Sequence, residues 1–217
     1  MTDQLNWRDG KVPVSTRFDD PYFSLDNGLA ETRHVFLQGN SLPERFCDGF
    51  RIAELGFGTG LNLLTAWEAF DTPGTLHFTS FEAFPITRDE AQQALAAFPE
   101  LATRAATLLS AWAQESFVFE AEGIRAEIIM GDANETLANW GGQADAWFLD
   151  GFSPAKNPEL WNAALLAQVG AHTKAGGTFA TYTAAGHVRR ALDAAGFEVA
   201  RVPGYGRKRH MSVGVKR

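Results

Sequence analysis

The stretch that most constrains the fold is RIAELGFGTGLNLLTAWEAF, residues 51–70. Its first five residues, RIAEL, are typical of a buried strand. Three glycines then alternate with other residues over 56–60, where the backbone must turn tightly or approach a bound group closely. The following segment has apolar residues at helical spacing, namely Leu61, Leu64, Trp67 and Phe70. Strand, glycine turn and helix in this order predict the first unit of a parallel α/β sheet.

Strand and helix signals continue to alternate along the chain. Further strands are expected at 76–82, in a hairpin that turns at Glu122–Gly123 and ends near Asp132, and at 146–149, 178–183, 197–202 and 210–216. Further helices are expected at 87–98, where Thr87 and Glu90 form a capping pattern, and at 105–113, 158–177 and 185–196. Such alternation implies right-handed crossovers and a mostly parallel sheet with helices on both faces, ending in an antiparallel pair.

Composition narrows the class of protein. With 217 residues, one α/β domain with decorations fits better than two complete domains. Cys47 is the only cysteine, which excludes an internal disulfide and a cysteine-based metal cluster. The five histidines show no close ligand spacing, so we expect no metal. The sequence shows neither a secretory leader pattern nor 18 consecutive apolar residues, so we expect a cytoplasmic protein without a membrane partner.

Charge is unevenly distributed. The net charge of −7 disfavours indiscriminate binding to nucleic acid. Residues 187–217, however, carry eight lysines and arginines against two acids, which gives this segment a net charge of +6. Such a segment either docks a phosphate backbone or is a solvated face, and charge alone does not separate the two.

Four acids lie at or near the ends of successive predicted strands, namely Glu54, Glu82, Asp132 and Asp150. In an open α/β sheet, ligands bind beyond the carboxyl ends of the strands. Any one of these acids alone would more simply be a turn or cap residue, because Asp is common where strands end. Four in succession favour a ligand site.

The glycine turn restricts the kind of ligand. A GxGxxG dinucleotide fingerprint is not met, because its third glycine would fall on Leu61 or Leu63, and no Gly-Lys-Ser/Thr ends the turn as in a nucleoside triphosphatase. The sequence ELGFGTG instead resembles the first motif of class I S-adenosylmethionine-dependent methyltransferases. This resemblance implies an α/β, Rossmann-like fold with a mostly parallel seven-stranded sheet and helices on both faces. It also implies S-adenosyl-L-methionine as the cofactor.

The same resemblance assigns residues to the cofactor. Glu82, 22 residues after Gly60, matches the acid that accepts hydrogen bonds from both ribose hydroxyls. Asp132 matches the acid that contacts the adenine amino group, and Glu54 lies beside the methionyl part. The residues implied for the cofactor site are Glu54, Gly56, Gly58, Gly60, Asn62, Glu82 and Asp132.

Asp150 ends the apolar run 146–149 and begins the loop DGFSPAKNP. This loop resembles the Asp/Asn-Pro-Pro-aromatic motif of amine methylases, in which a carboxylate or amide holds the attacking nitrogen. An alkylamine has a pKa of roughly 10 and must lose a proton before it attacks, and Asp150 or a water can accept that proton. Phe152 is expected either to line the pocket or to be a core aromatic residue. Methylation at C5 of a pyrimidine is disfavoured, because Cys47 lies far from this loop in sequence.

Longer motifs narrow the resemblance. The segments FDDPYFS, GLAETRHVFLQGN, ELGFGTGLN, FLDGFSPAKNPELW, TYTAAGHVRRALDAAGF and GYGRKRHM together resemble the bacterial tRNA 5-methylaminomethyl-2-thiouridine methyltransferase family, which comprises MnmD and the methyltransferase part of MnmC. Its members methylate the exocyclic amine of 5-aminomethyl-2-thiouridine at the tRNA wobble position. The resemblance therefore implies Asp150 as the catalytic residue and the anticodon arm of tRNA as the partner.

Further contacts are implied by the same match. Tyr22 closes the cofactor pocket, and the substrate-binding residues are Phe152, Pro154, Lys156, Asn157, Arg207, Lys208 and Arg209. For Asn157 a role in stabilising the loop is equally compatible. A flipped wobble base also needs an aromatic partner, for which Phe152, Tyr205 and Trp161 are the candidates. Two other classes stay open: a methyltransferase for a small-molecule or protein amine, and a scaffold that binds the cofactor without chemistry.

Bifunctional members of the family continue into an FAD-dependent oxidase. The 217 residues leave no room for such a domain, so we expect no oxidase activity in this chain. Three sources of the amine stay open: a separate FAD-dependent oxidase that acts upstream as a second partner, another route to 5-aminomethyl-2-thiouridine, or a longer protein of which this sequence is a fragment. We expect residues 1–48 to form an N-terminal extension packed on a methyltransferase domain of residues 49–217. Within the extension, Asp9–Gly10 predicts a hairpin, and an irregular, aromatic-rich segment is expected at 18–40.

Overall fold

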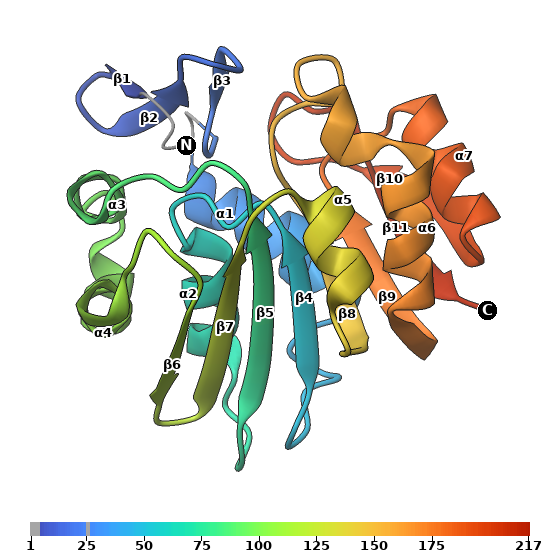
Figure 1. Cartoon of the computed structure of the whole chain (residues 1–217), viewed down its shortest axis with the longest axis horizontal. Helices are drawn as coiled ribbons and strands as arrows, with labels where there is room; N and C mark the ends of the chain where they lie inside the picture. Colours follow the sequence, from blue (N-terminus) through green and yellow to red (C-terminus); the bar gives the residue numbers. More distant parts are fainter. Residues whose placement is uncertain (1–4, 25–26) are drawn as a thin grey trace.

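The computed structural model describes residues 5–24 and 27–217, and at its centre is an eight-stranded sheet with the order β10-β11-β9-β8-β4-β5-β7-β6 (Figure 1). The strands are β4 (Arg51–Leu55), β5 (Leu76–Glu82), β6 (Phe117–Ala121), β7 (Ile124–Met130), β8 (Ala144–Leu149), β9 (Thr173–Thr181), β10 (Phe197–Pro203) and β11 (His210–Lys216). The central pairs are parallel and the pairs at both edges are antiparallel, which confirms the predicted architecture. The family resemblance implied a seven-stranded sheet. The eighth strand, β6, is the first arm of the predicted hairpin that turns at Glu122–Gly123.

Helices cover both faces of the sheet (Figure 1). One face carries α1 (Gly28–Thr32), α2 (Leu61–Ala69), α3 (Arg88–Leu95) and α4 (Ala102–Ala111), and the other carries α5 (Ala133–Thr136), α6 (Ala163–Ala171) and α7 (Gly186–Ala194). Trp147 and Phe148 of β8 are both fully buried, one in each layer, because successive side chains of a strand point to opposite faces. Within the two described ranges, no helix is long and apolar enough to cross a membrane.

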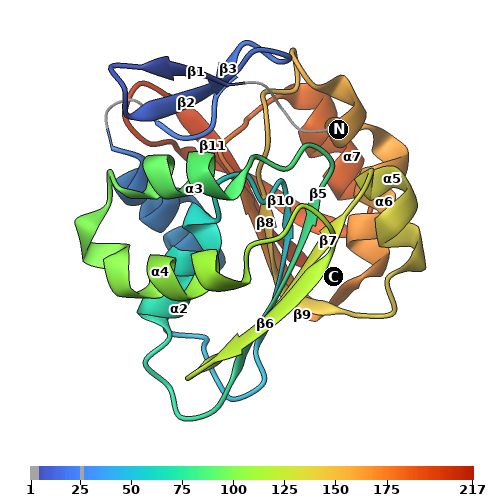
Figure 2. The ribbon, with the colours of Figure 1, turned by 60° about the vertical axis from the view of Figure 1, so that its left-hand side comes forward.

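The N-terminal segment forms a small antiparallel sheet of β1 (Leu5–Arg8), β2 (Val12–Ser15) and β3 (Asp20–Pro21), which Figure 2 shows above one end of the large sheet. The predicted turn at Asp9–Gly10 joins the first two strands. The prediction of an irregular segment at 18–40 is wrong over residues 28–40, which are helical. There α1 continues into a π-helical turn (Arg33–Leu37) and a 3-10 turn (Gln38–Asn40).

Packing explains that helical run. The side chain of Asn27 caps α1 by accepting from the N–H of Ala30 at 2.9 Å, and Val35, Phe36 and Leu37 are buried in the core. Burial of this apolar stretch on the sheet stabilises helices that are too short to persist alone. The division of the chain at residue 48 stays a prediction, and residues 1–4 and 25–26 of the predicted extension lie outside the described residues.

Two helix boundaries test the sequence rules. Thr87 caps α3 through the predicted reciprocal pair with Glu90. The helix expected at 158–177 is shorter, because a 3-10 turn (Pro158–Trp161) precedes α6 and residues 173–177 already belong to β9. The Thr173 hydroxyl donates to the Val169 carbonyl at 2.6 Å where the helix ends, and Gly176, at φ +71°, lies in a register irregularity between β8 and β9. The remaining 3-10 turns are Pro99–Leu101 and Leu137–Asn139.

Candidate active site

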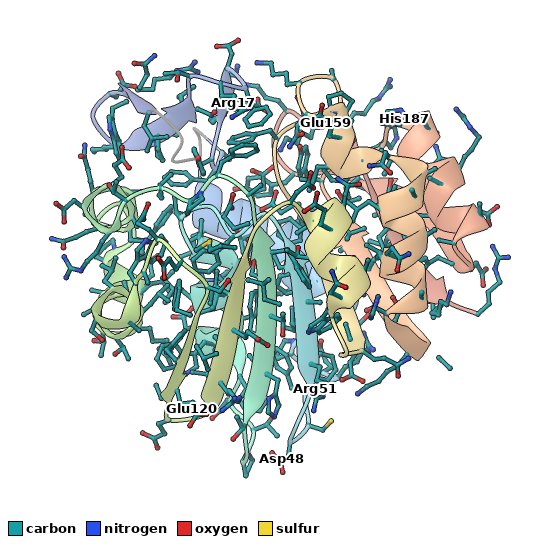
Figure 3. The ribbon with its side chains drawn as sticks, in the orientation of Figure 1. Arg17, Asp48, Arg51, Glu120, Glu159 and His187 are labelled. Carbon is teal, nitrogen blue, oxygen red and sulfur yellow. The ribbon has the colours of Figure 1, made fainter. Side chains whose placement is uncertain are left out.

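A cavity of about 570 Å³ opens at the carboxyl ends of the parallel strands. Its wall is built by the residues that end or follow β4, β5, β7, β8 and β9, together with the N-terminal segment and the loop between β10 and β11. Arg17 and Glu159 lie toward this end of the molecule in Figure 3, whereas Asp48 and Arg51 lie at the opposite end. The volume is in the range of small-molecule and cofactor sites.

Asn62, in the first turn of α2, joins two acids from neighbouring strands. Its Nδ2 donates to Glu54 Oε1 and to Asp150 Oδ2, both at 2.8 Å. Its Oδ1 accepts from the hydroxyl of Thr32 at 3.0 Å, and the Ser80 hydroxyl donates to the second oxygen of Glu54 at 2.6 Å. Because both amide protons and the amide oxygen are engaged, Asn62 is fixed, and it fixes the Asp150 carboxylate in turn.

The protonation of both acids is set by burial. Burial raises the pKa of the Asp150 carboxyl from its ordinary 3.8 to about 6, against the hydrogen bonds from Asn62 and the Gly151 N–H. Burial also raises the pKa of Glu54 well above its ordinary value, against hydrogen bonds from Ser80 and Asn62. Asp150 is therefore mostly ionised at neutral pH while its proton affinity stays close to the working pH, as a general base requires.

The glycine turn holds Glu82 against the cavity. The Gly58 N–H donates to Glu82 Oε2 at 2.9 Å, and the Phe84 N–H donates to Oε1 at 2.7 Å. Gly58 has a φ of +54°, and a Cβ there would lie 3.1 Å from Cδ1 of Tyr22, so this turn needs glycine. A carboxylate held in this way can accept hydrogen bonds from a pair of neighbouring hydroxyls.

Asp132 follows β7 and has two roles in the local structure. Its Oδ1 accepts from the backbone N–H and the side-chain Nδ2 of Asn134, at 2.9 and 2.8 Å, and so caps the short helix α5. It is exposed and it also lines the cavity. Asp132 is therefore both a helix cap, which was the simpler of its two interpretations, and part of the cavity wall.

Aromatic residues close the cavity over the loop that follows Asp150. Phe152 lines the cavity, stacks on Phe18 with ring centroids 4.6 Å apart, and meets Tyr22 edge-on at 5.1 Å. Trp161 is buried and its indole N–H donates to the carbonyl of Phe152 at 2.8 Å. Trp161 therefore supports the loop and is not placed to stack on a base.

Polar contacts fasten the same loop to the N-terminal segment. The Ser153 N–H donates to Asp20 Oδ2 at 2.8 Å. The Lys156 ammonium contacts the main-chain carbonyl and the carboxylate of Asp19, the latter at 3.1 Å. Lys156 is thus engaged within the protein, and its charge is directed at the N-terminal segment.

Tyr182 and Glu31 are among the residues of the cavity wall that the sequence interpretation missed. The Tyr182 hydroxyl donates to the carbonyl of Gly151 at 2.8 Å, and burial followed by the charges of Asp150, Asp20 and Glu31 raises its pKa well above 10. Glu31 Oε1 accepts from the ammonium of Lys208 at 2.8 Å. Tyr182 directly follows β9 and lies one residue before the end of the predicted strand 178–183, so the rule that found the acids could have found it; Glu31 carries no such signal.

A family model described as S-adenosyl-L-methionine-dependent methyltransferase matches residues 96–217, more than half of the chain. The chain belongs to this methyltransferase family. The bifunctional protein MnmC of tRNA 5-methylaminomethyl-2-thiouridine biosynthesis from Chromobacterium violaceum is 46% identical over 225 residues, covering 97% of this chain and 34% of that protein. The MnmC of Caulobacter vibrioides is 50% identical over 216 residues, which cover 94% of this chain and 36% of that protein. The methyltransferase thus spans about a third of the length of these relatives.

Solved structures agree with the fold. The crystal structure of MnmC2 from Aquifex aeolicus superimposes with a TM-score of 0.73 at 27% identity, covering 98% of this chain and 70% of that one. DesVI of Streptomyces venezuelae, at 14% identity and a TM-score of 0.52, shares the fold alone. The class I methyltransferase fold predicted from the glycine turn is confirmed.

The residues present fit S-adenosyl-L-methionine, the cofactor of this methyltransferase family. Glu82 offers a fixed anionic acceptor for ribose hydroxyls, and the turn at Gly58 has no room for a side chain. Of the residues implied for cofactor and substrate, eleven line the cavity: Tyr22, Gly56, Gly58, Asn62, Glu82, Asp132, Asp150, Phe152, Asn157, Arg207 and Lys208.

Five implied residues are not part of the cavity wall, namely Glu54, Gly60, Pro154, Lys156 and Arg209. Glu54 has no exposed surface and lies behind Asn62, so it acts on the cavity only through that amide. Gly60 precedes α2 at φ +78°, and a Cβ there would lie 2.8 Å from Leu108, which gives it a packing role. Among the described residues, no cluster of three His, Cys, Asp or Glu side chains is placed to hold a metal ion.

Proposed function

We propose that this methyltransferase transfers the methyl group of S-adenosyl-L-methionine to the exocyclic amine of 5-aminomethyl-2-thiouridine at the tRNA wobble position, giving 5-methylaminomethyl-2-thiouridine. The observation that carries the proposal is the carboxylate of Asp150, fixed by Asn62 in the wall of the cavity. A carboxylate is the group expected to hold an amine acceptor. The relatives that match 94–97% of the chain, and that are named for the biosynthesis of this nucleoside, support it.

The cofactor, when bound, supplies a methyl group activated on a sulfonium. We assign its ribose to Glu82, its adenine end to Asp132, and its remaining contacts to Gly56, Gly58 and Asn62, with Tyr22 over it. These assignments are supported by the position of all six residues in the cavity wall.

Asp150 then has three tasks in the chemistry. Its charge attracts the amine as an ammonium, its oxygens accept hydrogen bonds that orient the nitrogen, and its carboxylate takes up the proton that the amine must lose before it attacks. Among the residues that the structure describes, the Gly151 N–H donates to one Asp150 oxygen and Asn62 to the other, both at 2.8 Å, so each oxygen keeps acceptor capacity for the amine.

The nucleotide needs an aromatic partner and a basic surface. Phe152 and Tyr205, which both line the cavity, are our candidates for stacking on the flipped base. Arg207 and the exposed Arg209 extend from the loop beside the cavity and are our candidates for phosphates of the anticodon arm.

The same proposal includes an FAD-dependent oxidase that acts upstream and exposes the amine that is methylated. The reaction takes place in the cytoplasm, where the tRNA is.

The test is methyl transfer from labelled S-adenosyl-L-methionine to bulk tRNA from a strain that lacks this activity, with mass analysis of the nucleosides. A rise in 5-methylaminomethyl-2-thiouridine, matched by loss of the 5-aminomethyl precursor, is the expected result. If the cofactor binds and no tRNA nucleoside changes, the tRNA assignment is wrong. A small-molecule or protein amine then becomes the acceptor to seek, because Asp150 and the cofactor site would serve it equally well.

A further inference from the structure

Lys208 and Glu31 form an ion pair in the wall of the cavity, although 177 residues separate them in sequence. The Lys208 ammonium lies 2.8 Å from Glu31 Oε1 and 4.0 Å from the centroid of the Tyr182 ring. Glu31 comes from α1, and Lys208 comes from the loop between β10 and β11. This ammonium therefore lies between a carboxylate and an aromatic face in the wall of the cavity.

The surroundings of this ammonium come from several elements. The charged or titratable groups that line the cavity with it include Glu31 of α1, Asp20 of β3, Asp150 after β8, Tyr182 after β9, and Tyr205 and Arg207 of its own loop, with His34 beside the Tyr205 ring. The field of the ion pair reaches Asp150: Lys208 lowers the pKa of the Asp150 carboxyl and Glu31 raises it. An amine held by Asp150 lies in that same field.

We propose that Lys208 is a positioning residue that keeps the acceptor amine in its uncharged, attacking form, and that Glu31 holds Lys208 in the place where it does so. This inference rests on the proposed function and specifies how the same cavity prepares its substrate.

The physical reason is the balance of charge at the acceptor. Two carboxylates, Asp150 and Glu31, would stabilise the ammonium, which has no lone pair and cannot attack. A cation beside the amine disfavours the ammonium, and Lys208 compensates the charge of Glu31. Loss of Lys208 should therefore leave binding of the cationic substrate intact or tighter while slowing transfer at neutral pH.

The test compares single-turnover rates and KM across the pH range, using an anticodon stem–loop that carries 5-aminomethyl-2-thiouridine. In Lys208→Met the rate–pH curve should move to higher pH by about one unit, with KM unchanged or lower. In Glu31→Gln it should move to lower pH, because Lys208 is then uncompensated. Lys208→Arg keeps the charge and should keep the profile, and Lys11→Met, at an exposed turn outside the cavity, is the matched control.

The two variants break the same ion pair, so a merely structural role would give both the same defect. Rate–pH curves that move in opposite directions in the two variants support the inference. If the wild type is active and the two curves move in the same direction, or do not move, the inference is wrong while the proposed function stands. A wild type that methylates no aminomethyl nucleoside at any pH overturns the proposed function and this inference with it. Thermal unfolding of each variant shows that the compared proteins are folded.

Discussion

Replacing Asp150 by Asn should stabilise the protein more at alkaline than at acidic pH. The carboxyl has a pKa of about 6 in the folded protein against an ordinary 3.8. A carboxyl whose pKa is raised by folding favours the folded state at low pH, and this contribution is lost as the pH rises through the folded-state value. At 1.36 kcal/mol per pKa unit, the shift makes ionised Asp150 destabilising by about 3 kcal/mol above neutral pH and by roughly half of that near pH 5.

The Asn variant lacks this titration but also weakens the hydrogen bonds from Asn62 and the Gly151 N–H, a loss of roughly 1–3 kcal/mol that does not depend on pH. This pH-independent loss cancels when the relative stability of the variant at one pH is subtracted from that at the other. We therefore expect the free energy of unfolding of the variant, relative to wild type, to rise by about 1–1.5 kcal/mol between about pH 5 and pH 8.

Urea unfolding followed by tryptophan fluorescence at both pH values measures this difference. Asp89→Asn, on a side chain that is 94% exposed, is the control for the chemical exchange itself. A relative stability that is the same at both pH values, or that falls at the higher one, would refute the argument that burial of Asp150 sets its proton affinity.

Three further outcomes are expected. The wild-type rate of methyl transfer should fall as the pH is lowered through about 6, because protonation removes the Asp150 carboxylate, and a pH–rate profile that is flat there would contradict this. Glu82→Gln should weaken binding of S-adenosyl-L-methionine about tenfold or more in calorimetry while transfer at saturating cofactor changes little; an unchanged Kd would remove Glu82 from the cofactor site. Gly58→Ala, with φ +54° and a Cβ 3.1 Å from Tyr22, should lose roughly 1–3 kcal/mol of stability and bind the cofactor more weakly. Gly10→Ala is the matched control, because Gly10 has φ +66° and a Cβ there would meet no atom within 4 Å, so that only backbone strain is added. Equal losses of stability in the two variants would contradict a clash between residue 58 and Tyr22.

The parts of the fold that follow from local chemistry were predictable. The buried run before Asp150, the turn at Gly56–Gly60 and the cap at Thr87 each depend on neighbours in sequence, and each lies where it was expected. Because parallel strands end at one edge of the sheet, the order of strand-terminal acids was enough to bring Glu82 and Asp150 to one cavity.

The parts that depend on distant contacts were not predictable. The pairing of Glu31 with Lys208 joins α1 to the last hairpin, and no local pattern marks either residue for the other. The helical run at 28–40 forms because its apolar residues pack on the sheet, which overrides weak local propensity. The family resemblance implied Lys156 as a substrate contact, and no local pattern indicated Asp19, which the fold places beside it.

The most direct test of the central claim is the single-turnover rate of methyl transfer by Asp150→Asn, measured with its affinity for S-adenosyl-L-methionine. The acceptor is the anticodon stem–loop with 5-aminomethyl-2-thiouridine, and the cofactor is saturating. We expect cofactor binding close to that of wild type and a rate lower by about 100-fold or more, because the amine loses its anionic partner and proton acceptor. A variant that binds the cofactor and transfers methyl at the wild-type rate would contradict the role of Asp150 and the account of the cavity built on it.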